Sequence, residues 1–243
     1  MDGMLIVNKP SGWTSFDVCA KLRNLTKTKK VGHSGTLDPM ATGVLPVFLG
    51  KATKSIQHFI GGDKGYVAEM TLGATSDTLD ADGQIRPRPE GPRPEGNTKF
   101  EIRNNIEDQI SKVIKNYIGD IEQTPPMYSA VKIKGKPLYK LARQGIVVER
   151  QKKKVKIYKL ELLGVKGNKV RFQVMCSKGT YIRVLASKIG DDLGCGAYLS
   201  ALERVYSHPF HISQAIDIVT LQNLSKVGRL GSVLLTPEEF VSI

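Results

Sequence analysis

The order of strand-like and helix-like segments constrains the fold of this chain more than any other feature of its sequence. Apolar runs and alternating apolar residues predict strands over residues 5–7, 44–49, 66–72, 155–163 and 169–176. Amphipathic spacing predicts helices over residues 15–27, 52–59, 107–117, 138–143 and 180–193. The two kinds of segment follow each other without regular alternation, which argues against a doubly wound parallel sheet. We therefore expect an α+β fold.

Turn and cap residues add local detail to this pattern. Residues 164–168 separate the last two predicted strands and indicate that these strands pair as a hairpin. A second hairpin turn is expected at residues 134–136. Ser15 and Thr180 are suitable N-caps for the helices that begin near them, and Gly194 fits a C-cap.

Residues 85–97 interrupt the pattern. From Arg86 to Gly96 there is no apolar residue, and four prolines prevent a regular helix or strand ladder. We expect a mobile surface loop here, with a linker as the alternative. A length of 243 residues, 40% of them hydrophobic, is sufficient for a sizeable core in one or two domains.

The charge balance points to a polyanionic partner. The sequence has 36 Lys and Arg against 23 Asp and Glu, a net charge of +13, which makes nucleic acid the leading candidate. A basic protein without such a partner is the alternative. No apolar run approaches the roughly 18 residues of a membrane span, and the N-terminus shows no secretory signal. Three distant cysteines fit a reduced cytosolic protein, and the scattered histidines and cysteines suggest no metal site.

Basic residues concentrate between positions 132 and 156, where Tyr139 lies among them and Tyr128 shortly precedes them. Cationic side chains bind phosphates, and aromatic rings stack on unpaired bases. The segment is therefore a candidate RNA-binding surface, with a solvated charged face as the alternative. The residues from which we expect RNA contacts are Lys132, Lys134, Lys136, Arg143, Lys152, Lys153 and Lys154.

Residues 32–43 form the densest candidate for chemistry, with three glycines, a proline, a histidine and an aspartate. Such a loop can present Asp38 on a rigid backbone. An aspartate before a proline often only hydrogen-bonds a turn, however, and His33 can be an ordinary loop histidine. Arg183 falls in the first turn of a predicted helix, where the helix dipole disfavours a cation. Pairing with a carboxylate would explain that placement, and a solvated arginine is the alternative.

Five segments, in order, resemble the motifs of the TruB family of pseudouridine synthases. They are residues 8–15, 32–43, 64–66, 125–132 and 179–183. The resemblance implies the pseudouridine synthase fold, a mixed and largely antiparallel sheet flanked by helices. It also implies a single catalytic domain over 1–243 with an RNA-gripping insertion at 123–150. Many relatives carry a C-terminal PUA domain, for which residues 205–243 look too short, so we expect a short form without it.

The resemblance implies that a uridine in the T-loop of transfer RNA is isomerised to pseudouridine, with no cofactor or metal. The uridine is flipped out of the loop. The N1–C1′ bond then breaks, the base rotates and C5 bonds to C1′. Asp38 is the implied catalytic residue, as a nucleophile on the sugar or as a base. Arg183 is its implied partner, since a nearby cation favours the ionised carboxylate. Tyr66 is implied to stack on the uracil and to assist proton loss from C5.

Other positions are implied to bind substrate or to support the loop. His33 would help to fill the space that the flipped uridine leaves, and Tyr181 and Leu202 would line the base pocket. Lys9 and Pro10 would support the loop that carries Asp38.

These implications favour a stand-alone, monomeric enzyme that acts in the cytoplasm on the T-arm of tRNA, with no obligatory protein partner and no membrane. The guide-RNA-dependent relatives of the dyskerin type carry the PUA domain that we do not expect here. The family's arginine pair after Leu202 is Glu203 and Arg204 in this chain, so no basic contact is expected at Glu203. The alternatives are an RNA-binding protein that refolds the tRNA elbow, and a pseudouridine synthase for another RNA. The combination of Asp38, Tyr66 and Arg183 favours an enzyme.

Overall fold

The computed structural model describes residues 1–88, 101–133, 135–236 and 239. Its chain divides into two compact units. Unit 1 comprises residues 1–66 and 202–243, and unit 2 comprises residues 67–201. Strands β4 (Lys64–Leu72) and β12 (Ala197–Ser207) carry the chain from one unit to the other. No helix in the described part of the chain is long and apolar enough to span a membrane.

The sheet of unit 1 has the strand order β14–β1–β3–β12. Strand β1 (Gly3–Lys9) is antiparallel to β3 (Thr42–Leu49) and parallel to β14 (Ile216–Asp217). On its other side, β3 pairs in parallel with β12. The short strand β2 (Val31–His33) pairs with β3, and the short strand β13 (Phe210–His211) pairs with β12. The sheet is therefore mixed in direction.

The two faces of this sheet bury alternate residues of the same strands. Met4 and Ile6 of β1 belong to a cluster with Val44 and Phe48 of β3, onto which α2 (Ile56–Ile60) packs. The ring of Phe59 lies 5.3 Å from that of Phe48, centroid to centroid. Helices α1 (Ser15–Thr26) and α6 (Ile218–Lys226) are joined by a 3.1 Å hydrogen bond from Ser225 Oγ to the carbonyl of Leu25. Short 3₁₀ turns occupy Gly50–Ser55, Ile212–Gln214 and Leu230–Val233.

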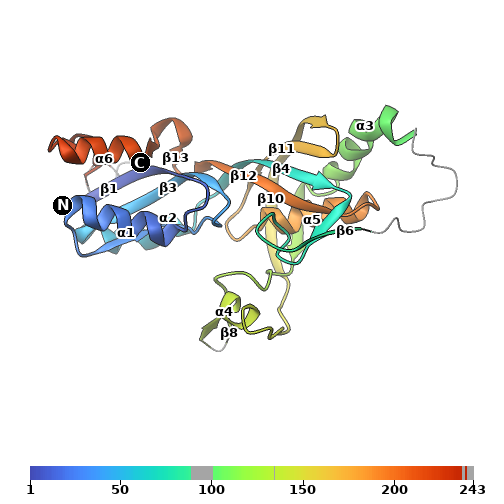
Figure 1. Ribbon diagram of the computed structural model, residues 1–243, viewed down its shortest axis with the longest axis horizontal. Helices are drawn as coiled ribbons and strands as arrows, with labels where there is room; N and C mark the ends of the chain where they lie inside the picture. Colours follow the sequence, from blue (N-terminus) through green and yellow to red (C-terminus); the bar gives the residue numbers. More distant parts are fainter. Residues whose placement is uncertain (89–100, 134, 237–238, 240–243) are drawn as a thin grey trace. The chain divides into compact units, whose positions relative to one another are not determined.

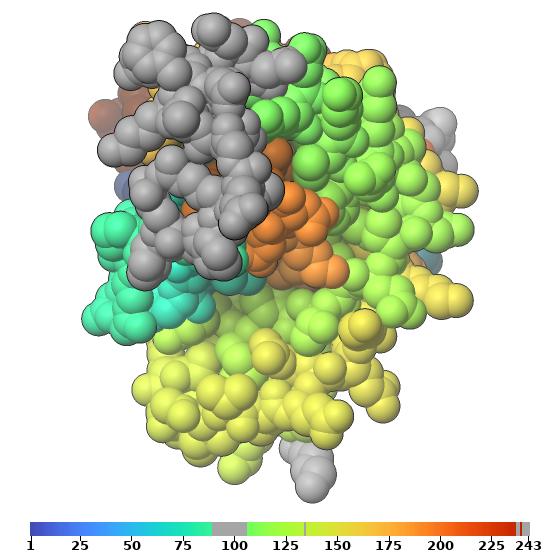
Figure 2. Space-filling view, turned by 90° about the vertical axis from the view of Figure 1, so that its right-hand side faces the viewer, coloured from blue at the N-terminus to red at the C-terminus, as the bar shows by residue number. Residues whose placement is uncertain are grey.

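The sheet of unit 2 has the order β12–β4–β11–β10–β7. Strand β10 (Lys153–Lys166) pairs antiparallel with β11 (Lys169–Cys176) and with β7 (Gly119–Gln123). Helix α3 (Glu101–Lys115) packs on β10 and beside α5 (Ile182–Asp192). In Figure 2 the green surface of α3 borders the orange surface of α5. A two-stranded ladder joins β5 (Ala74–Ser76) to β6 (Ile85–Pro87).

Residues 124–152 form a lobe that projects from the sheet of unit 2 (Figures 1 and 2). The lobe contains β8 (Lys132–Ile133), β9 (Lys136–Pro137) and α4 (Leu138–Ala142). Strands β8 and β9 pair as the expected hairpin. Of the insertion expected over 123–150, Gln123 instead ends β7 and is 1% exposed.

The α+β class and the mixed, mainly antiparallel sheet are confirmed, as is the hairpin of β10 and β11. Both predicted N-caps are wrong. Thr14 caps α1 through a capping box with Asp17, and Tyr181 is the N-cap residue of α5. The hydroxyl of Thr180 instead donates to the carbonyl of Ser177. The side chain of Ser15 has the separate task described below.

The loop predicted from residue 85 is wrong at its start. Residues 85–87 form β6, in which Arg86 pairs with Thr75 of β5 and Pro87 lies at the end of the two-stranded ladder, where a proline is tolerated. Arg88 continues from this strand, and its backbone N–H donates to the carbonyl of Gly73. Residues 89–97 lie outside the described part of the chain, so the rest of that expectation stays a prediction.

Candidate active site

The loop that carries Asp38 joins β2 to β3 and is bounded by two glycines in left-handed backbone conformations, Gly35 (φ 88°) and Gly43 (φ 103°). A Cβ atom at Gly43 would lie 2.3 Å from the carbonyl oxygen of Arg204, so no side chain fits there. Asp38 itself is half-buried. The glycines thus let the loop turn closely against β12 and hold the carboxylate on an ordered backbone.

The first loop of the chain holds the peptides on both sides of Asp38. The Ser15 hydroxyl, 2% exposed, accepts from the N–H of Leu37 at 2.9 Å and donates to the Leu37 carbonyl at 3.3 Å. The N–H of Gly12 donates to the carbonyl of Pro39 at 2.9 Å. Ser15 can bond in this way because the capping of α1 is left to Thr14. Gly12 and Ser15 therefore fix the backbone at Leu37, directly before Asp38, and at the carbonyl of Pro39, one residue beyond it.

The buried side chain of Lys9 also connects the first loop of the chain to the loop that carries Asp38. Its side chain is fully buried, and its Nζ donates to the carbonyls of Pro10 (2.9 Å), Pro39 (3.1 Å) and Trp13. An ammonium that is buried among carbonyl oxygens is a structural cross-link with a positive charge. Pro10, half-buried, contributes one of the three carbonyls.

Tyr66 and Arg204 meet in the same unit, from β4 and β12. Tyr66 is 9% exposed and Arg204 is 1% exposed. The Arg204 guanidinium donates from Nε to the carbonyl of Val44 at 2.7 Å and from Nη2 to the carbonyl of Gly35 at 3.1 Å. Burial lowers the pKa of the Arg204 guanidinium, and the nearby Tyr66 raises it. Arg204 therefore connects the Asp38 loop to β3.

His33 precedes this loop, at the end of β2. Burial lowers the pKa of the His33 imidazole, and the positive charge of Arg204 lowers it further. His33 is consequently a neutral ring at pH 7.

Leu202, on β12, is 8% exposed in the same unit. Lys64 is 6% exposed, and its Nζ donates to the carbonyl of Gly62 at 2.7 Å.

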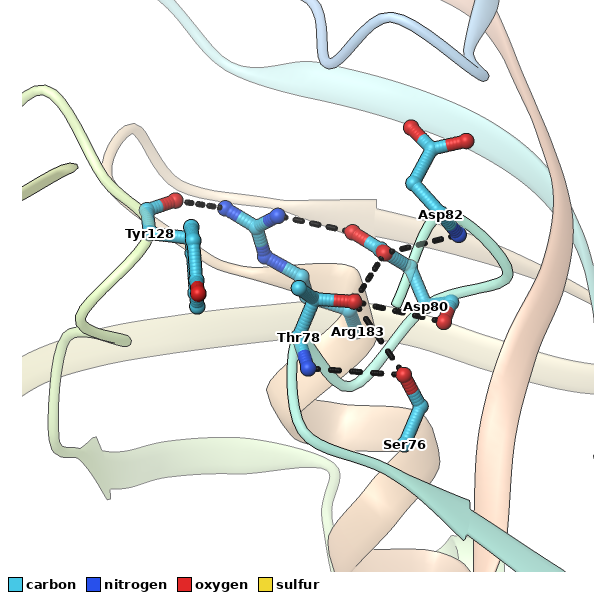
Figure 3. A network of polar contacts seen from close by, with 6 residues as sticks. All are labelled: Ser76, Thr78, Asp80, Asp82, Tyr128 and Arg183. Carbon is cyan, nitrogen blue, oxygen red and sulfur yellow. Dashed lines mark hydrogen bonds and ion pairs between the residues drawn. The ribbon is translucent and has the colours of Figure 1, made fainter. Parts of the chain in front are cut away.

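Unit 2 contains a second polar centre around Arg183 (Figure 3). Arg183 Nη1 donates to Asp80 Oδ2 at 2.8 Å, and the side chains are only 5% and 3% exposed. Nη2 donates to the carbonyl of Tyr128, in the lobe, at 2.6 Å. The other carboxylate oxygen of Asp80 accepts from the hydroxyl of Thr78 and from the N–H of Asp82. Arg183 is thus a buried, paired arginine and not a solvated one.

Tyr181 lies beside this centre. The side chain of Gln123 accepts from the N–H of Tyr181 at 2.9 Å and donates to its carbonyl at 3.3 Å. The guanidinium of Arg183 lies 5.9 Å from the centre of the Tyr181 ring, within cation–π distance. The expected carboxylate partner of Arg183 was Asp38, which belongs to unit 1, and that pairing stays a prediction.

The basic residues predicted to contact RNA fall in two places. Lys132, Lys136 and Arg143 are exposed in the lobe, and Arg143 lies 5.6 Å from the centre of the Tyr139 ring. Lys153 and Lys154 are exposed at the start of β10, after Lys152. Lys152 makes a long ion pair of 3.8 Å with Glu122. Lys134 lies outside the described residues.

Sequence reasoning missed Asp80 and the position of Arg204. Asp80 lies in an acidic run, Asp77 to Asp82, which was the available signal. Arg204 gave no such signal, because arginine is rarely buried completely and β12 was not predicted.

Comparison with known structures places the fold. The chain aligns with a chain of a Cbf5-Nop10-Gar1 complex with a TM-score of 0.72 and 32% identity, covering 98% of this chain and 60% of that one. It aligns with a chain of an H/ACA RNP bound to a substrate RNA containing 2′-deoxyuridine with a TM-score of 0.69 and 29% identity, covering 98% and 60%. The chain thus spans less than two thirds of these structures' chains.

Sequence comparison defines the class. Residues 23–182 match the family model of the TruB family pseudouridylate synthase (N terminal domain). A protein of Dehalococcoides mccartyi named tRNA pseudouridine synthase B is 44% identical over 99% of this chain and 77% of its own length. Its namesake in Geobacillus thermodenitrificans is 48% identical, over 98% and 78%. The fold and the sequence are those of a pseudouridylate synthase. Within that class, the chain belongs to the TruB family.

Proposed function

We propose that this chain isomerises a uridine of tRNA to pseudouridine, at the T-loop, with Asp38 as the catalytic residue. The observation that carries the proposal is the fixing of the backbone around Asp38. Ser15 binds the backbone of Leu37, and Gly12 and Lys9 bind the carbonyl of Pro39, on a loop that Arg204 also binds. A fixed carboxylate is what a reaction at the C1′ carbon of a flipped nucleotide requires.

The chemistry needs an ionised carboxylate and a route for one proton. The N1–C1′ bond breaks with the help of Asp38, acting as a nucleophile on the sugar or as a base. The uracil rotates, C5 bonds to C1′, and the proton on C5 leaves while N1 gains one. Lys9, Lys64 and Arg204 are buried cations of the same unit, bound to carbonyl oxygens, and their charges favour the ionised form of Asp38. Tyr66 takes the C5 proton.

The remaining residues bind and position RNA. Neutral His33 helps to fill the space of the extruded uridine, and Tyr181 and Leu202 line the base pocket. Arg183, which is paired with Asp80, is a further cation that favours the charge on Asp38. The lobe closes on the T-arm through its exposed basic residues, which attract phosphates.

The proposal also covers the domain organisation, the cofactor and partner requirements and the cellular location of the enzyme. Both units function as one catalytic domain that needs no cofactor, no obligatory protein partner and no second copy of the chain. The enzyme works in the cytoplasm. None of the three cysteines, all in the described part of the chain, forms a disulfide, as a reducing compartment favours.

The test uses a tRNA transcript and an isolated T-arm hairpin, each labelled with tritium at uridine C5. Isomerisation releases the tritium to water and is counted directly. We compare the wild type with Asp38→Asn and with Asp108→Asn, an exposed position on α3, as the matched control. Wild type and Asp108→Asn should release tritium, and Asp38→Asn should be slower by at least about 10³-fold with RNA affinity retained.

The other possible results of this experiment favour other functions. Tight binding without release favours a protein that only binds and refolds tRNA. Release from a ribosomal or messenger RNA fragment, but not from tRNA, favours a different substrate. Release by Asp38→Asn at the wild-type rate contradicts the role of Asp38.

A further inference from the structure

The two carboxylate oxygens of Asp80 bind different partners (Figure 3). Oδ2 accepts from Nη1 of Arg183 at 2.8 Å. Oδ1 accepts from the Thr78 hydroxyl at 2.5 Å and from the N–H of Asp82 at 3.2 Å. An arginine and a carboxylate frequently pair through two parallel hydrogen bonds, one to each oxygen. Here Oδ1 is occupied from within the loop 76–82, and Arg183 binds Oδ2.

The other amino group of Arg183 binds the lobe. Nη2 donates to the carbonyl of Tyr128 at 2.6 Å. The next carbonyl along the chain, that of Ser129, accepts from the N–H of Tyr139 at 3.0 Å inside the lobe. The lobe is therefore tied to the start of α5 through a nitrogen that a bidentate pair with Asp80 would use. Which arrangement forms depends on whether Oδ1 of Asp80 is occupied.

The loop 76–82 fixes the Thr78 hydroxyl on Asp80. The Oγ of Ser76 lies 3.1 Å from that of Thr78, and because Thr78 donates its hydrogen to Asp80, Ser76 is the donor. Leu79 joins Thr78 to Asp80 in a left-handed conformation (φ 66°) that leucine rarely adopts. A Cβ atom at Gly83 would lie 2.3 Å from Thr78 Oγ1. The chain thus closes over this hydroxyl at a position where no side chain fits.

We infer that Thr78 is a positioning residue: its hydroxyl occupies Oδ1 of Asp80, keeps Arg183 from pairing bidentately and so leaves Nη2 to hold the lobe. The inference rests on the proposed function for the use of the lobe, which is to bind RNA. Without the Thr78 hydroxyl, Oδ1 retains the longer bond from Asp82, and a bidentate pair with Arg183 becomes the better arrangement. The lobe then loses its attachment at Tyr128.

The first test reads the lobe directly and needs neither activity nor RNA. Hydrogen exchange of the Tyr139 amide is followed by NMR in the wild type, in Thr78→Val, which keeps the side-chain shape, and in Thr78→Ser, which keeps the hydroxyl. The control is Thr75→Val, at a half-buried threonine of β5. Exchange should be about fivefold faster in Thr78→Val and close to the wild-type rate in the other two variants. Unchanged exchange in Thr78→Val, or an equal acceleration at Phe172 of β11, overturns the inference.

The second test asks whether Thr78 acts through Arg183. Exchange at Tyr139 is measured for Thr78→Val in the wild-type and Arg183→Lys backgrounds, since a lysine cannot pair bidentately. The acceleration should fall below about twofold in the Arg183→Lys background. Equal accelerations in both backgrounds overturn the inference and leave Thr78 a structural residue. If Thr78→Val does not fold, Ser76→Ala, which removes the donor to Thr78, replaces it with the same expected direction.

Binding of the T-arm hairpin then connects the lobe to the proposed function. Thr78→Val should weaken hairpin binding by about fivefold, because an unattached lobe has to be ordered on the RNA, and Thr78→Ser should stay within about twofold of the wild type. Faster lobe exchange with unaltered hairpin binding would support the positioning role of Thr78 and contradict the proposed role of the lobe. The failure of the inference and the failure of the proposed function are thus distinguishable.

Discussion

Arg183 and Asp80 form an ion pair almost closed to water. A buried pair of opposite charges adds little net stability, because desolvation offsets the attraction, but the loss of one partner leaves a buried charge and costs roughly 3–5 kcal/mol. The pair also holds the lobe, since the same guanidinium binds the carbonyl of Tyr128. One side chain thus couples the start of α5 to the loop 76–82 and to the lobe (Figure 3).

Replacing Asp80 by Asn should therefore be severe. Asp80→Asn keeps the shape but removes the negative charge beside Arg183, so we expect about 3 kcal/mol less stability in urea unfolding and at least tenfold slower tritium release. Asp82→Asn, an exposed position on the same loop, should stay within about 0.5 kcal/mol of the wild type. Equal effects of the two variants would show that the charge of Asp80 has no special role.

The role of an individual residue could be predicted from the sequence where that residue conflicts with a local structural preference. Arg183 in the first turn of a helix conflicts with the helix dipole, and that conflict correctly indicated a carboxylate partner. One such partner, Asp80, lies 103 positions from Arg183 in the sequence, so its identity depends on the tertiary structure. Asp38 was singled out by the glycines around it, whereas the bonds of Ser15 to Leu37 have no sequence signature.

At the scale of elements, β10 begins with a run of exposed lysines. Lys152, Lys153 and Lys154 are all exposed, and one ion pair of 3.8 Å with Glu122 offsets little of their charge. These lysines are available to phosphates.

The triple charge reversal Lys152→Glu, Lys153→Glu and Lys154→Glu should weaken tRNA binding and flatten its dependence on salt. For every phosphate that the variant no longer binds, the slope of log K against log salt should fall by about 0.7–0.9. The control reverses the exposed Lys51, Lys54 and Lys226, which changes the net charge equally. Binding is measured by filter retention across salt concentrations. An unaltered slope in the first variant would mean that this run faces solvent in the complex.

Strands and helices whose apolar residues recur at a regular spacing could be predicted from the sequence, and the others could not. The strands β1, β3, β4, β10 and β11 and the helix α5 follow their patterns. Strand β12 does not, because its buried Leu199 and Leu202 are three residues apart and its buried Arg204 is a cation. Strand β7 carries exposed acidic residues, Asp120 and Glu122, and is specified by its ladder with β10 instead of by apolar spacing.

The whole molecule should lose stability on acidification in two stages. Burial, and then the charge of Arg204, lower the pKa of His33 below its ordinary 6.5, so the unfolded chain binds this proton first and stability falls as the pH drops below about 6.5. Asp17 and Asp217, which accept hydrogen bonds at helix starts from Thr14 and Thr220, have pKa values below 3.8. Their stabilisation is complete above about pH 4 and is lost as the pH falls further.

Thermal unfolding measured from pH 8 to pH 3 checks this expectation. The melting temperature should be constant above pH 7, decline below pH 6.5 and fall more steeply below pH 4. His33→Asn should remove the first decline, and Asp217→Asn should reduce the second. A melting temperature that rises between pH 7 and pH 5 would contradict the direction given for His33.

Unit 1 is built from the two ends of the chain, with the continuous unit 2 between them in sequence. During synthesis the ribosome makes Asp38 and the loop that holds it early, but β12, β14 and Arg204 only after residue 197. A nascent or truncated chain therefore carries Asp38 long before it has the strand and the arginine that bind the loop around it. The site proposed for catalysis is therefore complete only late in translation, and an incomplete product would present the exposed lysines 152–154 without it.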